Sequence, residues 1–149
     1  MSDSQFSPDG LRTLIRAGAW IDRPDTRKAG VHLLTFTKLP DQPGFAELVE
    51  LVQIPEYDDG QDIQVAVIRD WTAVFALPAV AQLSEDDRRL LALAESLITG
   101  QPVDLAATVA VSGHDHALRI MEAMVIATGY HMEYNLTPSA RLTTKLARR

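Results

Sequence analysis

The amino-acid sequence predicts an α+β fold, a single helix-rich domain with a small sheet of three to five strands. Two long segments have helical periodicity with recognisable caps, and two shorter segments are rich in β-branched and aromatic residues. The 149 residues are close to the usual size of one domain, and no repeat or Pro/Ser-rich linker divides them. We therefore expect one α+β domain over residues 1–140 and a basic C-terminal tail over residues 141–149.

Capping residues and stop signals predict the helices. Ser7 before Pro8 is typical of an N-cap and first helical position, and Ser84 precedes three acidic residues that suit the positive end of the helix dipole. Gly100 followed by Pro102 ends that second helix. The predicted helices cover residues 7–18, residues from Asp70 to the break at Pro78, residues 84–99, and a short piece within 103–111.

A further helix is predicted over residues 115–128, where apolar residues recur at helical spacing before Gly129. The segment Ser112–Asp115 resembles a capping box. Beyond the first turn the helix carries only two ionic residues, Arg119 and Glu122. Such a narrow polar strip predicts burial on most sides, either in the protein's own core or against a partner.

The strands are predicted from β-branched and aromatic runs at residues 31–38 and 63–69, with a late edge strand at 130–135. Residues 45–53 are ambiguous, because their apolar positions fit a helical period while a strand would leave neither face apolar. We favour a helix there, which would make residues 31–69 a strand–helix–strand unit with a parallel pair. A strand there would instead give a meander.

The net charge of −6 is unevenly distributed along the chain. Residues 39–87 hold eleven acidic residues and the single base Arg69, whereas the tail Arg141–Arg149 is basic. An acidic middle opposes non-specific binding to nucleic acid, whose phosphates attract lysine and arginine. A solvated acidic face that maintains solubility is one interpretation. Another is a docking surface over residues 41–62 for a basic protein partner, or for the tail of a second copy.

Several classes of function are excluded by what the sequence lacks. The absence of cysteine excludes disulfides, thiolate metal sites and thiol nucleophiles. The glycines are too dispersed for a phosphate-binding loop, and no Gly-x-Ser-x-Gly motif occurs. No apolar run is long enough for a membrane span, and the first residues do not resemble a signal peptide. We expect a soluble cytoplasmic protein without a cofactor.

Three of the four histidines fall within residues 114–131 and form the one concentration of reactive groups. His114 and His116, with Glu133 or Asp115, are candidate metal ligands or a general base. The helix that begins near them is about 20 Å long, so His131 could join His116 only through a chain reversal or a second subunit. In the alternative interpretation, His116 packs in the core with one hydrogen bond while His114 and Asp115 serve the helix N-terminus.

Two weaker sequence patterns have alternative interpretations. The acidic segment Glu56–Asp62 could be a calcium-type loop but lacks the required ligand spacing, so a polar turn at Asp59–Gly60 is favoured. Residues 105–128 are faintly similar to a helix-turn-helix DNA reader. Ala110 stands at the turn glycine, however, and the following helix is too apolar to contact bases.

The function predicted from these patterns is a non-catalytic regulatory or protein-interaction domain that self-associates as a homo-oligomer. The expected interaction residues lie on the apolar helix and are Met121, Met124, Val125 and Arg119. The first alternative is a metal-assisted hydrolase or lyase that uses His114 and His116. The second alternative is DNA binding by the helix-turn-helix candidate at residues 105–128.

Overall fold

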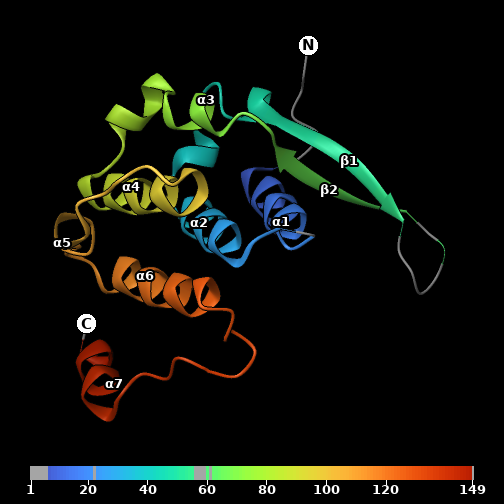
Figure 1. The fold of residues 1–149 in the computed structure, drawn as a ribbon. Helices are drawn as coiled ribbons and strands as arrows, with labels where there is room; N and C mark the ends of the chain where they lie inside the picture. The colour runs from blue at the N-terminus through green and yellow to red at the C-terminus, as the bar shows by residue number, and fades with distance from the viewer. Residues whose placement is uncertain (1–6, 22, 56–59, 61, 149) are drawn as a thin grey trace.

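The computed structural model describes residues 7–21, 23–55, 60 and 62–148. Helices dominate the described chain, and a two-stranded antiparallel sheet interrupts them once (Figure 1). In chain order the elements are α1 (Pro8–Ala19), α2 (Asp25–Phe36), η1 (Leu39–Asp41), η2 (Ala46–Leu48), β1 (Val49–Pro55), β2 (Asp62–Ile68), α3 (Trp71–Phe75), η3 (Pro78–Gln82), α4 (Glu85–Thr99), α5 (Leu105–Thr108), α6 (His114–Ala127) and α7 (Ala140–Ala147). The predicted α+β, helix-rich class is confirmed, although the described sheet has two strands instead of three to five.

Helix α2 is the central element of the core, since α1, α4 and α6 all pack against it. Six of its twelve residues are buried, and they include Leu33 and Leu34, which are fully inaccessible to solvent. Figure 1 shows α2 behind α4, with α6 lying below them. Burying large aliphatic side chains on several sides of one helix supplies much of the hydrophobic free energy that stabilises this fold.

The β1–β2 hairpin packs through one end against α1 and projects away from the helices at the other end (Figure 1). Val49 pairs with Ile68 at the inner end, and Pro55 pairs with Asp62 at the outer end. Gly18 allows the close approach of α1, because a Cβ atom there would lie 2.1 Å from the Ala66 carbonyl oxygen. Glycine is thus required sterically where helix and strand meet.

The caps predicted from sequence are confirmed at three helices. The Ser7 hydroxyl accepts a hydrogen bond from the Gly10 amide at 3.2 Å, and the Ser84 hydroxyl accepts one from the Asp87 amide at 3.1 Å. The Asp70 carboxylate accepts a hydrogen bond from the Ala73 amide and so caps α3, which ends before Pro78. Helix α4 ends at Gly100 in the left-handed conformation. The short helix expected within residues 103–111 is α5.

The strand predicted at residues 31–38 is wrong, because residues 25–36 form α2. The strand–helix–strand unit at 31–69 is therefore also wrong: a helix comes first, and the two strands that follow are antiparallel. Residues 45–53 were favoured as helix, yet only Ala46–Leu48 form one 3-10 turn before β1. The strand prediction at 63–69 is confirmed by β2.

Two predictions near the ends of α6 are wrong. Residues 130–135 form a turn and an extended segment instead of an edge strand. The N-cap of α6 is Gly113, which has no side chain that could accept a capping hydrogen bond. The predicted Ser112–Asp115 capping box is therefore absent. Within the predicted basic tail, residues 141–147 belong to α7. The calcium or turn interpretation of residues 56–62 concerns positions that lie mostly outside the described residues.

Candidate interaction surface

The N-termini of α4 and α6 are joined through two adjacent carboxylates, Asp86 and Asp87. The Asp86 carboxylate accepts hydrogen bonds from the Ser112 hydroxyl at 2.8 Å, the Ser112 amide at 3.2 Å and the Gly113 amide at 3.1 Å. These hydrogen bonds, those from Ser112 foremost, lower the pKa of Asp86. Asp86 thereby holds the two residues that precede α6 against the first turn of α4.

Asp87 is buried, and its two carboxylate oxygens contact different elements. One oxygen lies 2.8 Å from Nε2 of His116, and the other accepts from the Lys38 amide at 3.0 Å. Nδ1 of His116 faces Asp86 at 3.9 Å. Both ring nitrogens of His116 thus face carboxylates within the chain, so a metal ion could reach Nε2 only by displacing Asp87.

The structure does not bring the candidate ligands His114, His116 and Glu133 together. His114 and His116 lie in the first turn of α6, whereas Glu133 is exposed beyond its other end, about 20 Å along the helix axis. His131 also lies at that far end, where its ring packs edge-on against Trp20 at 4.7 Å. Within the described ranges, no three histidine, aspartate or glutamate side chains are arranged to hold a metal ion.

An aromatic and charged cluster fastens the middle of α6 to α1 and α2. The guanidinium groups of Arg16 and Arg119 lie 4.4 and 3.8 Å from the centroid of the Phe36 ring. Arg119 also donates to Glu122 at 2.6 Å, and Glu122 lies 3.6 Å from Nε2 of His32. Stacking of guanidinium groups on an aromatic ring is favourable when the groups are partly desolvated. The Arg119 guanidinium therefore contacts Phe36 and Glu122 instead of projecting into solvent.

His32 in this cluster makes the stability of the protein dependent on pH. Burial lowers the pKa of His32, and the charges of Arg16 and Arg119 act in the same direction, while Glu122 opposes them. Below about pH 6.5 the unfolded chain binds a proton that the folded protein takes up only at lower pH. The free energy of unfolding should therefore fall as pH drops from about 7.5 to about 5. Chemical denaturation at both values should show a smaller fall for His32→Gln than for the parent protein; equal falls would contradict this assignment.

The acidic region that was considered as a docking surface is partly neutralised within the chain. Asp41 accepts from Arg12 at 2.8 Å, and this hydrogen bond lowers the pKa of Asp41. Glu50 pairs with Arg69 across the β1–β2 hairpin. Binding of a basic partner over residues 41–62 stays a prediction.

The side of α6 that faces away from α2 is apolar and accessible to solvent. Ile120, Ala123 and Ile126 are buried on the inner side. Met121 and Met124 are 48% and 36% exposed on the outer side. These methionines lie beside the partly exposed apolar residues Ala117, Leu118 and Val125. We call these five residues the outer face of α6.

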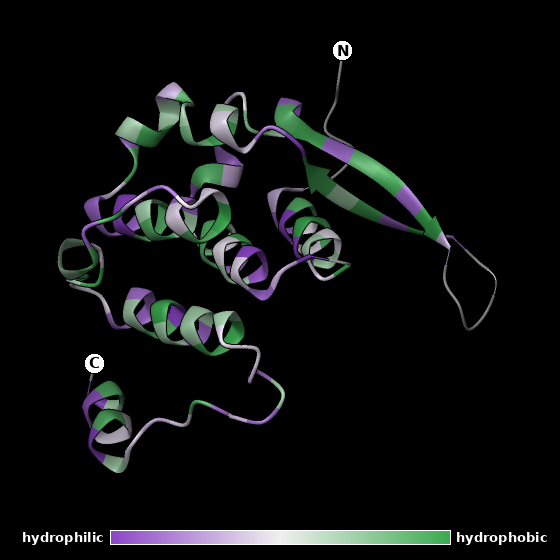
Figure 2. Cartoon of the chain, viewed as in Figure 1, coloured by the Kyte–Doolittle hydropathy of each residue, from purple (hydrophilic) through white to green (hydrophobic). Residues whose placement is uncertain are grey.

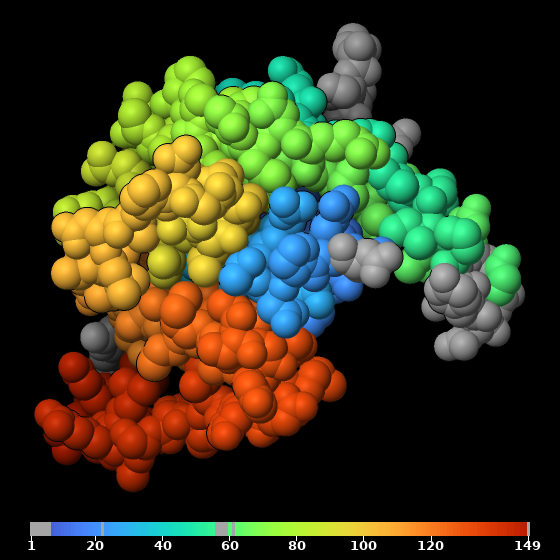
Figure 3. All heavy atoms as spheres, in the orientation of Figure 1, coloured from blue at the N-terminus to red at the C-terminus, as the bar shows by residue number. Residues whose placement is uncertain are grey.

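Exposed apolar residues continue from this face into the segment that follows. Of eleven large hydrophobic residues that are exposed in the described chain, eight lie beyond residue 100. Four of them belong to the segment between α6 and α7: Tyr130, Met132, Tyr134 and Leu136. Figure 2 shows apolar residues along α6, in this segment and on α7, and Figure 3 shows the same part of the chain at one end of the molecule. We call residues 130–148 the C-terminal arm.

Helix α7 in the C-terminal arm is amphipathic but has no buried residue. Ser139 caps it by accepting from the Leu142 amide at 3.2 Å. Leu142 and Leu146 are one turn apart and half-buried, while Arg141 and Lys145 are exposed. A helix of eight residues is not stable alone in water, so its apolar side gains stability only by packing.

Of the predicted interaction residues, the structure places Met121, Met124 and Val125 on the outer face of α6 and Arg119 on the inner side. The spacing explains this, because Arg119 and the buried Ile126 are seven residues apart, which is nearly two helical turns. Sequence reasoning missed the exposed residues of the C-terminal arm. The alternation of Tyr130, Met132 and Tyr134 predicted a strand. In the structure these three side chains are exposed and belong to no strand.

The described helices include none with the length and apolar character needed to cross a bilayer. The helix-turn-helix candidate at 105–128 corresponds to α5, a turn and α6, but the single arginine of α6 is held by Phe36 and Glu122. The apolar residues of the outer face and the C-terminal arm, by contrast, are accessible to solvent.

Comparisons of this chain with protein-family models, with curated protein sequences and with solved structures found no match.

Proposed function

We propose that this protein is a non-catalytic regulatory or interaction domain that self-associates through the outer face of α6. The observation that carries the proposal is the concentration of exposed apolar residues on this face and the adjoining C-terminal arm. Exposed large apolar residues concentrated in one part of a protein are typical of protein–protein contacts.

The composition of the surface supports the proposal as well. Met121 and Met124 are flexible and polarizable, and such side chains adapt to an apposed surface. Tyr130 and Tyr134 pack edge to face at 6.1 Å, so each presents a rigid ring with a polar tip. Aromatic residues and methionine are enriched in the cores of interfaces, where charged residues are depleted.

Two copies related by a two-fold axis would bury the same residues on each partner, so a single helix face can serve both copies. The residues that could do chemistry support a non-catalytic role, since His116 and the two carboxylates beside it are engaged with one another and with backbone amides. On this proposal the histidines near α6 position the helix and take no part in a reaction.

Sedimentation velocity across the micromolar concentration range tests the proposal. We expect a concentration-dependent shift from monomer to dimer for the parent protein. The double variant Met121→Glu, Met124→Glu should raise the dissociation constant by about 100-fold or more, because it places carboxylates in an apolar contact.

The matched control is Leu51→Glu, which changes a similarly exposed apolar residue on the β1–β2 hairpin. This variant should dimerise like the parent protein, and circular dichroism should show the same helix content in all three. A parent protein that stays monomeric at the highest concentration would refute the proposal. So would a double variant that is folded and dimerises unchanged.

A further inference from the structure

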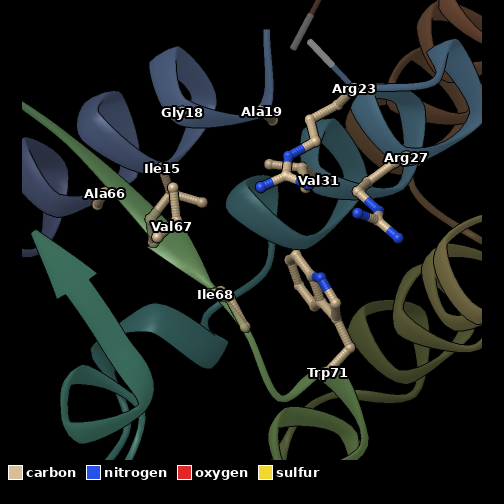
Figure 4. A pocket seen from close by; sticks show the side chains of 10 residues that line it. All are labelled: Ile15, Gly18, Ala19, Arg23, Arg27, Val31, Ala66, Val67, Ile68 and Trp71. Atoms are coloured by element: carbon tan, nitrogen blue, oxygen red, sulfur yellow. The ribbon is translucent and has the colours of Figure 1, made fainter. Parts of the chain in front are cut away.

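A small cavity lies where α1, α2, β2 and the start of α3 meet, away from the outer face of α6. It has a volume of about 20 Å³, enough for one water-sized group. Its wall is part apolar and part polar, and Arg23 and Arg27 line it together with the indole of Trp71 (Figure 4). The lining residues are Ile15, Gly18, Ala19, Arg23, Arg27, Val31, Ala66, Val67, Ile68 and Trp71.

The two arginines bring positive charge to this cavity. None of the described lining residues carries a carboxylate. Nε of Arg27 is buried and has no hydrogen-bond partner among the described residues. Leaving a buried donor of a charged group unpaired costs free energy, so the folded chain retains an arginine here at a cost to its stability.

Neither arginine forms an ion pair with a described carboxylate, whereas Arg12, Arg69, Arg89 and Arg119 all do. Figure 4 shows the two guanidinium groups and the Trp71 indole extending toward the same space. Planar guanidinium groups bind oxyanions through paired N–H donors, and carboxylate is a matching acceptor.

We propose that this cavity binds the carboxylate group of a small ligand whose apolar stem lies against Trp71. The cavity is partly open to solvent, and its small volume accepts little more than one carboxylate oxygen, so the rest of the ligand must lie at the mouth. There it meets the half-buried Trp71 and the exposed Arg23. A tetrahedral phosphate is larger and carries no apolar stem, so the site favours carboxylates over inorganic phosphate.

Sodium hexanoate is the test ligand, and the fluorescence of Trp71 is the readout. The chain has two tryptophans, so the variant Trp20→Phe leaves Trp71 as the sole tryptophan. Titration at constant ionic strength should give a saturable change in emission. Acetate should bind more weakly than hexanoate because it lacks the stem, and sodium chloride and phosphate should give no saturable change.

Arg23→Gln and Arg27→Gln in this background should each weaken hexanoate binding by about tenfold or more, because each removes charge-assisted hydrogen bonds. Arg23 is exposed, so its substitution should leave the fold intact. The matched control is Arg88→Gln, an exposed arginine of α4 that does not line the cavity. A response that is linear, that chloride or phosphate reproduces, or that persists in Arg23→Gln would overturn the proposal.

A second measurement separates a binding role of Arg27 from a structural one. Arg27→Met keeps an unbranched side chain and removes the unpaired donor, so without ligand the midpoint of thermal unfolding should stay the same or rise. Hexanoate should raise the midpoint of the parent protein and leave that of Arg27→Met unchanged. A lowered midpoint of Arg27→Met, with no effect of hexanoate on either protein, would show that Arg27 is structural and would refute the site.

Discussion

Replacing Gly18 with alanine is expected to lower the free energy of unfolding by about 3 kcal/mol. The new Cβ would lie 2.1 Å from the carbonyl oxygen and 3.0 Å from the carbonyl carbon of Ala66. Both atoms belong to the β2 backbone, which cannot move aside like the end of a flexible side chain. The helix and the hairpin would have to separate, and the apolar contacts between them would weaken.

The effect has a sign opposite to that of the same substitution at an exposed helical site, where alanine stabilises a helix by about 1 kcal/mol relative to glycine. Urea unfolding followed by circular dichroism measures the change. Ala17→Ser, at the exposed neighbouring position, should stay within about 0.5 kcal/mol of the parent protein. A Gly18→Ala protein as stable as the parent would show that α1 does not pack this closely on β2.

Replacing Asp87 with alanine is expected to cost about 3 kcal/mol of stability. The carboxylate is 5% exposed and links three parts of the chain, because it accepts from the Lys38 amide, lies at hydrogen-bond distance from His116 and belongs to the first turn of α4. Alanine would leave the Lys38 amide and the His116 ring without this partner and would open a cavity between α4 and α6.

The same unfolding measurement should give a smaller loss for Asp87→Asn, since the amide oxygen can still accept one of the two hydrogen bonds. Asp115→Ala, which removes an exposed carboxylate from the first turn of α6, is the matched control and should cost less than about 1 kcal/mol. Equal losses at Asp87 and Asp115 would contradict the role assigned to Asp87.

Local capping chemistry made three of the helices predictable from the sequence. Ser7, Asp70 and Ser84 each accept a hydrogen bond from an amide three residues later, and this interaction depends on no distant part of the chain. The apolar spacing of residues 115–128 likewise specified α6. What it could not specify was which apolar residues face inward, because both sides of this helix are rich in them.

Helix α2 was interpreted as a strand because its second half is β-branched and aromatic, from Val31 to Thr37. Packing against α1, α4 and α6 leaves this helix with little polar surface, and a buried helix and a buried strand then have the same apolar pattern. Proline at its N-cap and the acidic Asp25 in its first turn were the available signals of a helix start.

A strand within residues 45–53 was the alternative interpretation, and it was not favoured for a different reason. β1 has no single apolar face, since Val52 and Ile54 are half-buried while Leu51 is exposed, so the strand periodicity is weak. The contact between His116 and Asp87 was also beyond sequence reasoning, because the partners are separated by 29 residues. A single core hydrogen bond for His116 was one of the two interpretations, but only the fold could supply its acceptor.

During synthesis, the central helix α2 leaves the ribosome before two of the helices that pack against it. Its apolar sides are covered by α4 and α6, which are translated later. At ordinary rates of protein synthesis, the interval between completion of Phe36 and completion of Ala127 is on the order of ten seconds. During this time the nascent chain exposes six residues of α2 that are buried in the folded protein, so chaperone binding to residues 25–36 would protect the polypeptide until α6 is made.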